Sequence, residues 1–210
     1  MSRILVILGH PNSSSWNGAL AEKYVEGAKE AGADIRYLKL GELDFDPVLR
    51  MGFQGEQPLE TDLENAKSLI EWSQHIVFVF PTWWVGMPAL LKGFIDRVFL
   101  PGWAFAYTKE SPLPAKLLKG RTARVLTTMD SPNWWYRLLH RRAVHRALVQ
   151  GTLHFVGISP VKETTIFADR ELSPKAREKW LNQVKTLAQK DTRKLQKKAQ
   201  STQTIPAHTS

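Results

Sequence analysis

Short apolar runs alternate along the chain with longer segments whose apolar residues repeat at helical spacing. A short continuous apolar run is typical of a strand that is buried on both faces of a sheet. We predict five strands, at residues 4–8, 34–38, 76–80, 124–128 and 161–167. Residues 4–8 form such a run, residues 76–80 are the most hydrophobic of the five, and residues 34–38 are the weaker second strand. We predict helices over residues 17–31, 88–99 and 143–155, and two more that begin at residues 61 and 174.

Signals at the helix ends support these boundaries. Gly32 follows the first helix, as a glycine does when it closes a helix in the left-handed conformation. Thr61 and Glu64 have the spacing of a capping box, in which each side chain satisfies a backbone N–H group at the start of a helix. Ser173 followed by Pro174 predicts the N-cap and the first residue of the last helix.

The alternation of strands and helices predicts an α/β fold. Its core would be a doubly wound, five-stranded parallel sheet in the order 2-1-3-4-5. The chain has 210 residues, which is enough for one domain with a sizeable core. We expect that domain to span residues 1–200, and we expect residues 201–210 (STQTIPAHTS) to be a disordered tail.

The net charge of +9 raises the question of nucleic-acid binding. The stretch from Lys185 to Lys198 contains six basic residues and one Asp, so it carries +5 of that total. Such a run is typical of a solvated helix end, and the rest of the domain is only mildly basic. Because the chain also lacks zinc-ligand spacings and RNA-binding aromatic motifs, we expect no nucleic-acid partner and no metal.

Two further absences concern the compartment. The chain has no Cys, which fits a reducing environment and excludes thiolate chemistry. It also has no apolar stretch with the length of a signal-peptide core or a membrane span. We therefore expect a cytoplasmic protein without membrane insertion.

The loop after the first strand, residues 9–17 (GHPNSSSWN), has a composition that suits an anion. It contains no acidic residue, three successive serines, an Asn and a His, and a helix begins at its end. Free N–H groups and the helix dipole favour a negative charge at such a position. An ordinary Ser/Asn-rich N-cap loop would have the same residues, so both interpretations stay open here.

The loop after the third strand, residues 81–88 (PTWWVGMP), places two tryptophans where a strand gives way to a helix. Two prolines and a glycine restrict the backbone, so that its N–H groups can point at a ligand. Flat aromatic side chains beside them suit a flat ligand by stacking. The alternative is that the tryptophans cover the core or a subunit contact, and this applies most to Trp84.

A third loop follows the fourth strand. It holds Thr127 and Thr128, then Met129 and Asp130, and then the aromatic cluster at residues 134–136 (WWY). In a doubly wound sheet ligands bind beyond the carboxyl ends of the strands, near the switch point between strands 1 and 3. A ligand with a planar ring and a phosphate group would match the chemistry of all three loops.

At this point the chain resembles the flavodoxin-like NAD(P)H:quinone oxidoreductases. This family includes mammalian quinone reductase, bacterial drug-activity modulators and ancillary proteins of potassium efflux. The resemblance rests on five stretches in the family's order: HPNSSSWN (10–17), PTWWVGMPALLKGFIDRVF (81–99), FAYT (105–108), LTT (126–128) and GTLHFVG (151–157). The second stretch is the most specific of them.

The resemblance implies a bound flavin, FMN or FAD, with NAD(P)H as the electron donor. Its phosphates would be held by His10, Ser14, Trp16 and Asn17. Its ring system would lie against the backbone of Pro81, Thr82, Trp83, Trp84 and Val85, with Thr127 and Thr128 along its edge. The substrate pocket would include Trp84, Trp135 and Tyr107, and Tyr107 would reach the pocket of the partner subunit in a homodimer.

The chain also departs from the family's pattern. Many relatives have Gly-Gly where this chain has Met129 and Asp130. In the family a Tyr and a His six residues apart manage charge during hydride transfer. Here Tyr136 and His140 are four apart, and Trp134 has the six-residue spacing to His140. We carry Tyr136 and His140 over as candidate catalytic residues.

The function that follows is hydride transfer from NAD(P)H through the flavin to a quinone or similar planar acceptor, by a ping-pong mechanism. A one-electron flavodoxin would have a first loop rich in Ser/Thr and Gly and an acidic chain, and a receiver domain would have acidic residues after its first strand and an Asp after its third. Neither pattern is present. The remaining alternative is a flavin-binding regulatory partner of a membrane transporter, with the basic stretch near the C-terminus as a docking element.

Overall fold

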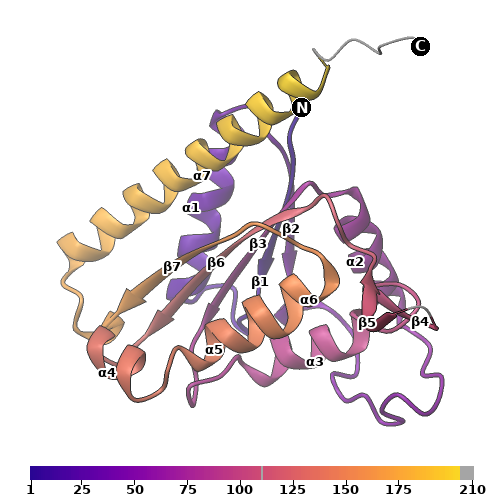
Figure 1. Cartoon of the computed structure of the whole chain (residues 1–210). Helices are drawn as coiled ribbons and strands as arrows, with labels where there is room; N and C mark the ends of the chain where they lie inside the picture. The colour runs from indigo at the N-terminus through magenta and orange to yellow at the C-terminus, as the bar shows by residue number, and fades with distance from the viewer. Residues whose placement is uncertain (110, 204–210) are drawn as a thin grey trace.

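The computed structural model describes residues 1–109 and 111–203. Its centre is a sheet of five strands, all parallel (Figure 1). These strands are β1 (Arg3–Leu8), β2 (Asp34–Lys39), β3 (His75–Pro81), β6 (Thr122–Met129) and β7 (Val161–Phe167). The sheet order is β2-β1-β3-β6-β7. The last two labels differ from the predicted numbering because a hairpin, β4–β5, lies between β3 and β6 in the chain.

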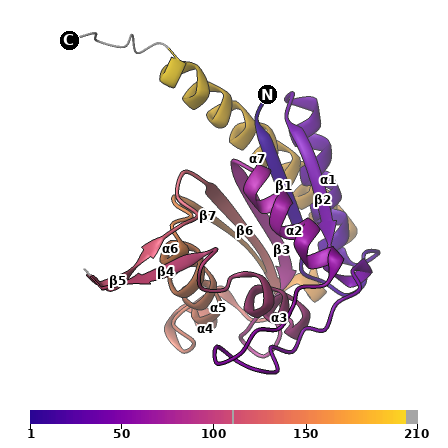
Figure 2. The same cartoon turned by 90° about the vertical axis from the view of Figure 1, so that its right-hand side faces the viewer.

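Helices cover both faces of this sheet (Figures 1 and 2). On one face lie α1 (Trp16–Glu30) and α7 (Pro174–Gln203), which pack on Ile4, Val6 and Leu8 of β1. On the other lie α2 (Thr61–Trp72), α3 (Ala89–Val98) and a helical segment over residues 143–156, which share a core with Leu5 and Ile7. All five of these β1 side chains are fully buried, as the continuous apolar run predicts.

The helical segment over residues 143–156 is continuous but not uniform. It begins as α5 (Ala143–His145), continues as η2 (Arg146–Leu153), which is wound as a π-helix, and ends as α6 (His154–Val156). Three short helical pieces complete the description, namely η1 (Leu40–Glu42), α4 (Asn133–Leu138) and η3 (Asp169–Glu171). The predicted helix over 143–155 is therefore present.

The hairpin is an antiparallel pair of β4 (Phe105–Thr108) and β5 (Ser111–Lys116), which projects from the body of the fold (Figure 2). At its base Phe105 packs edge-to-face against Phe155, with ring centroids 5.0 Å apart. Its other aromatic residue, Tyr107, is 74% exposed. We did not predict the hairpin, because β5 contains two prolines and neither strand has a clear alternation of apolar and polar residues.

Two expectations at helix ends are wrong. The capping box does not form, because Thr61 is already the first residue of α2 and Glu60 is its N-cap. The carboxylate of Glu60 instead binds the buried guanidinium of Arg97, at 2.8 Å. At the C-terminus α7 extends through residues 201–203, where we expected disorder to begin, and the rest of the predicted tail, residues 204–210, lies outside the described part.

A buried ionic network connects α7 to the sheet and to α1. The carboxylate of Asp191 accepts hydrogen bonds from Arg124 Nε (2.6 Å) and Nη2 (3.1 Å), from Lys162 Nζ (2.6 Å) and from Tyr24 Oη (3.0 Å). Burial alone would raise the pKa of Asp191, but the hydrogen bonds from Arg124 and Lys162 hold it at about 2. Asp191 is therefore charged at neutral pH and is the polar anchor of α7.

Candidate functional site

The carboxyl ends of the central strands meet at one edge of the sheet. In the strand register Leu8 lies opposite Val79, Pro81 opposite Thr128, and Met129 opposite Phe167. The loops that follow β1, β3 and β6 therefore leave the sheet at the same edge. This is the arrangement expected for a ligand site at the switch point between β1 and β3.

Within the loop after β1, hydrogen bonds organise an N-cap. Ser15 Oγ accepts from the Gly18 N–H at 3.2 Å, and Asn12 Oδ1 accepts from the Ser14 N–H at 2.9 Å. His10 Nδ1 accepts from the Asn12 N–H at 2.9 Å, so the ring proton is on Nε2, and burial lowers the pKa of His10. The N-cap interpretation is thus correct as far as Ser15 is concerned, and we had not singled that residue out.

The start of α1 contains buried polar atoms that have no hydrogen-bond partner. Asn17 is buried and its Nδ2 donates to Thr128 Oγ1 at 3.1 Å, while its Oδ1 and the indole Nε1 of Trp16 are buried without a hydrogen-bond partner. The Arg177 guanidinium lies over the Trp16 ring, 5.0 Å from its centroid. Buried polar atoms without partners are rare in folded proteins. Together with the nearby cation, they fit a loop that binds an anion.

The two tryptophans lie in a strained turn. Trp83 and Gly86 exchange backbone hydrogen bonds of 3.0 and 2.9 Å, so the turn is two residues long. Its central residues, Trp84 and Val85, have φ of 51° and 60°, the left-handed region that costs a residue with a side chain roughly 1–2 kcal/mol. Trp84 is fully exposed, and Trp83 packs edge-to-face on His10 with centroids 5.4 Å apart. Strain of this kind is concentrated at functional sites.

A pair of substitutions at Trp84 tests the strain. We expect Trp84→Gly to raise the free energy of unfolding by about 1 kcal/mol relative to Trp84→Ala, because only glycine adopts this φ without strain. Trp84→Ala is the matched control, since it also removes the exposed ring but keeps the strain. Urea unfolding at equal protein concentration measures both. If the two variants are equally stable, the turn is not strained.

Threonine side chains hold the loops after β3 and β6 together. The Thr82 N–H donates to Thr128 O at 2.7 Å, and the hydroxyls of Thr82 and Thr127 share a hydrogen bond of 2.9 Å. Thr127 and Thr128 are buried, and Thr128 also accepts from Asn17. These contacts bring together residues from all three predicted loops. Their role toward a cofactor stays a prediction.

Tyr136 and His140, the candidate catalytic pair, are not brought together. Tyr136 is buried, and its hydroxyl lies 2.8 Å from Nδ1 of His145, whose Nε2 lies 3.1 Å from Thr165 Oγ1. His140 instead accepts a hydrogen bond of 3.0 Å from Trp135 Nε1. Burial raises the pKa of Tyr136 and lowers that of His145 to about 4. His145 is nine residues from Tyr136, and no spacing that we considered would have identified it.

The residues that replace the family's Gly-Gly take different positions. Met129 is buried in the core, whereas Asp130 forms an ion pair of 2.8 Å with Arg170. Burial, and next the neighbouring Asp130 carboxyl, raise the pKa of Asp169 to about 6. The edge of the site at the ends of β6 and β7 therefore has a pair of interacting carboxyl groups, which the sequence did not reveal because Asp169 lies far along the chain.

Large aromatic and aliphatic side chains stand exposed on the hairpin and on α4. Tyr107 is on the hairpin, and Trp134 and Trp135 are on α4 with ring centroids 5.5 Å apart. Leu138 and Leu139 extend the exposed apolar surface of α4. The predicted pocket residues Trp84, Tyr107 and Trp135 come from separate elements and are all exposed.

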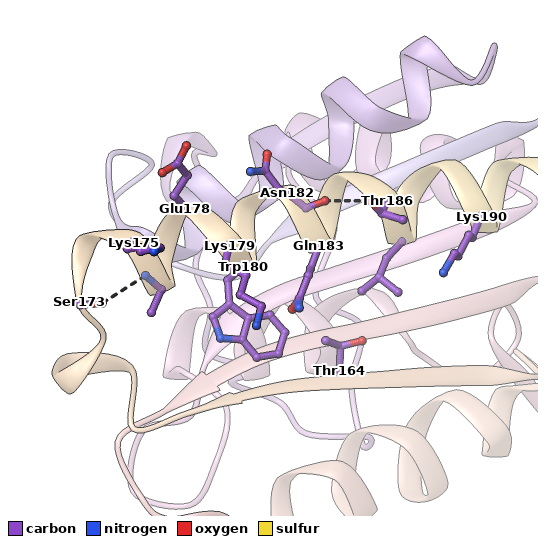
Figure 3. Close-up of a pocket in the computed structure, with 12 residues that line it drawn as sticks. Thr164, Ser173, Lys175, Glu178, Lys179, Trp180, Asn182, Gln183, Thr186 and Lys190 are labelled. Carbon is purple, nitrogen blue, oxygen red and sulfur yellow. Dashed lines mark hydrogen bonds between the residues drawn. The ribbon is translucent and has the colours of Figure 1, made fainter.

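A cavity of about 960 Å³ lies elsewhere. It is a groove between α7 and β7, shown in Figure 3, where Trp180 and Gln183 of α7 stand above Thr164 of β7. It contains none of the predicted site residues, and lysines such as Lys175 and Lys179 border it. Within the described ranges we find no group of three or more His, Asp or Glu that could hold a metal ion, and no helix long and apolar enough to cross a membrane.

The chain belongs to the family with the flavodoxin-like fold, whose model matches residues 2–188. It is 30% identical over 173 residues to an uncharacterized NAD(P)H oxidoreductase of Haemophilus influenzae, a match that covers 80% of this chain and 84% of the relative. It is 26% identical over 204 residues to NAD(P)H dehydrogenase (quinone) 1 of Cavia porcellus, covering 84% and 72%. The predicted oxidoreductase class is thus confirmed at the level of the family.

Solved structures agree with the fold. Smu.1420 of Streptococcus mutans superposes with a TM-score of 0.77 at 30% identity, covering 90% of this chain and 99% of that one. An NAD(P)H:quinone oxidoreductase of Methanothermobacter marburgensis superposes with a TM-score of 0.75 at 23% identity, covering 90% and 98%. At that identity the second match supports the fold alone.

Proposed function

We propose that the protein is an NAD(P)H dehydrogenase (quinone) that binds a flavin, FMN or FAD, at the carboxyl edge of its sheet. The observation that supports this most is the strained turn at residues 83–86, which exposes an indole ring beside a loop with buried, unpartnered polar atoms. The relatives named NAD(P)H oxidoreductase and NAD(P)H dehydrogenase (quinone) point to the same activity. A bound flavin supplies two-electron chemistry, accepting a hydride from one partner and reducing another.

The residues present fit such a cofactor. The N–H groups of Trp16 and Asn17 precede the first hydrogen bond within α1, which Ala19 donates to Ser15 O at 3.0 Å. These N–H groups, with Ser14 and His10, would hold phosphate at the helix N-terminus. The backbone from Pro81 to Val85 would support one ring face, and the polar atoms at Thr127 and Thr128 would line an edge.

The protein's own contribution to the reaction would be position and exclusion of water. Trp84 and Trp135 would flank a flat acceptor, and stacking against such rings favours planar molecules over chain-like ones. Backbone N–H groups near a ring edge would stabilise negative charge that develops there. Tyr136, paired with His145, could hold a proton at its hydroxyl, which is the role we propose for it in place of the pair with His140.

We expect a ping-pong mechanism, because donor and acceptor would use the same pocket in turn while the opposite ring face packs against protein. Steady-state rates with NADH or NADPH at several fixed quinone concentrations should therefore give parallel lines in double-reciprocal plots. Lines that intersect would require a ternary complex and a second binding region. Cofactor reduction by NAD(P)H without turnover of any quinone would favour a regulatory role as partner of a transporter.

We also propose a homodimer, because exposed apolar surface of this extent is unusual for a monomer. The hairpin residue Tyr107 and the α4 residues Trp134 and Leu138 would be covered in it. Multi-angle light scattering at micromolar concentration should give about twice the chain mass of 23.9 kDa. We expect Leu138→Glu to shift the mass toward the monomer, whereas Val48→Glu, at an exposed position outside the proposed interface, should not. A wild-type monomer mass would contradict the proposal.

A further inference from the structure

A second cavity, of about 430 Å³, lies at the opposite edge of the sheet from the proposed flavin site. It is bordered by the amino-terminal ends of three strands, at His75, Thr122 and Lys162, and by α7 from Asp191 onward. Figure 1 shows this end of α7 near the N-terminus of the chain, where the strands begin. The loops that follow β1, β3 and β6 contribute nothing to it.

The floor of this cavity contains a buried polar atom without a partner. The His75 side chain is 5% exposed, its Nδ1 is 2.7 Å from Thr122 Oγ1, and its Nε2 has no hydrogen-bond partner. Nε2 lies 3.9 Å from Asp191 Oδ2, which is too far for a hydrogen bond. Burial lowers the pKa of His75 to about 4, so the ring is neutral at pH 7 and can present an N–H group. A buried donor of this kind calls for an acceptor.

The charge around the cavity is strongly positive. Four lysines line it, Lys162, Lys194, Lys197 and Lys198, against the single carboxylate of Asp191. That carboxylate is already neutralised by Arg124 and Lys162 at 2.6 Å each. No ion pair is found for Lys194 or Lys197 within the described ranges. A negative charge on a ligand would therefore meet cations that the fold itself does not neutralise.

The remaining surface of the cavity is apolar. Ala123 is buried at its floor, and Leu195 and Pro160 contribute apolar walls, with the Thr122 and Ser201 hydroxyls beside them. An inorganic anion gains no binding energy from apolar walls. An anion with a short hydrocarbon chain would bury these walls away from water, which is favourable. The cavity therefore combines exposed cations, a buried imidazole nitrogen and apolar walls.

We infer that this cavity is a second ligand site, which takes a small organic carboxylate with an apolar body. The carboxylate would lie among Lys194 and Lys197 and accept a hydrogen bond from His75 Nε2, and the hydrocarbon part would contact Leu195 and Pro160. A cavity of about 430 Å³ has room for a molecule of the size of octanoate, whose chain-like body differs from the planar acceptor proposed for the other edge of the sheet. The site is independent of the proposed oxidoreductase function.

Binding of octanoate to the full-length protein tests this inference by NMR of the histidine rings. The six histidines give few signals, and that of His75 is assigned through its contact with Thr122. We expect octanoate to shift the His75 signal in a saturable way. The double variant Lys194→Gln/Lys197→Gln should weaken binding about five-fold, since each exposed charge contributes modestly. The matched control Lys175→Gln/Lys179→Gln, on the same helix but bordering the groove of Figure 3, should stay within about two-fold of wild type.

Two further ligands test separately whether the site recognises the negative charge and whether it recognises the hydrocarbon body. Octanamide has the same body without the charge, and it should bind at least about five-fold more weakly than octanoate. Inorganic phosphate is charged but has no hydrocarbon part, so it should not shift the His75 signal at the concentration at which octanoate does. If octanamide binds as tightly as octanoate, the site does not recognise an anion. If phosphate binds as tightly as octanoate, the site does not recognise an apolar body. A shift confined to His10 or His140 would place octanoate at the flavin edge and contradict the inference.

Discussion

Replacing Asp191 with Asn is expected to lower the free energy of unfolding by about 3–5 kcal/mol at pH 7. The carboxylate of Asp191 accepts four hydrogen bonds, and Asn cannot supply the charge that Arg124 and Lys162 face. Removing one partner of a buried ion pair leaves an uncompensated charge, which is costlier than the pair itself is stabilising. Urea unfolding of both proteins measures the difference.

The pH dependence of that difference has a definite sign. The folded-state pKa of Asp191, about 2, is below its ordinary value of 3.8. A depressed carboxyl pKa contributes stability that is present above the unfolded-state pKa and is lost as the pH falls through the folded-state pKa. Wild type should therefore keep its advantage over Asp191→Asn down to about pH 4, and that advantage should shrink between about pH 4 and 2.

Asp96→Asn is the matched control for this substitution. Asp96 pairs with Lys92 at 2.6 Å on the surface of α3, where the side chains of Lys92 and Asp96 are 56% and 39% exposed. An exposed pair of this kind contributes at most about 0.5 kcal/mol, so the control should be close to wild type. A cost for Asp191→Asn as small as that of Asp96→Asn would show that the network does not anchor α7.

Replacing Asn17 with Asp should weaken flavin binding by roughly 30- to 150-fold, equivalent to about 2–3 kcal/mol. The substitution puts a carboxylate at a buried position beside the place proposed for phosphate, where it repels the phosphate and offsets the attraction of the helix N-terminus for that anion. It also replaces the Nδ2 group that donates to Thr128 Oγ1. Quenching of flavin fluorescence on titration with protein measures the dissociation constant.

Two control variants separate the effect of the added charge at residue 17 from other effects of the substitution. Asn182→Asp makes the same change on an exposed turn of α7, next to the groove of Figure 3, and should leave flavin binding unchanged. Asn17→Ser removes the side-chain contact without adding charge and should weaken binding only about five-fold. If Asn17→Asp folds, as judged by near-UV circular dichroism, and binds flavin as wild type does, Asn17 is not part of the site.

The strands, and the edge of the sheet at which the predicted loops meet, could be predicted from the sequence because their signals are local. Residues 4–8 and 76–80 are apolar runs, and the more polar strands β2 and β7 are recognised by their alternation with helices. The strand order follows from the connection rules that parallel sheets share. Once the strands are placed, the loops at residues 9–17 and 81–88 must meet at one edge. Ser173 illustrates the same point for a helix, since its Oγ accepts from the Ala176 N–H at 3.3 Å as an N-cap should.

The features that could not be predicted depend on partners far apart in the chain. Thr61 and Glu64 have the spacing of a capping box, but α2 begins at Thr61, one residue earlier than a cap at Thr61 requires. The N-cap is Glu60, whose carboxylate forms an ion pair with Arg97. Tyr136 meets His145 and not His140, because the turn between α4 and α5 reverses the chain with Arg141 and Arg142 in the left-handed region. Local spacing carries no information about such contacts.

Reconstitution with flavin tests the central claim most directly. The purified protein is incubated with excess FMN or, separately, excess FAD and is passed through a gel-filtration column, and the absorption spectrum of the protein peak is recorded. We predict that about one flavin per chain co-elutes with the protein, and that mass analysis of the released cofactor identifies it as FMN or FAD. A protein peak without flavin absorption after both incubations would contradict the proposed site and the activity inferred from it.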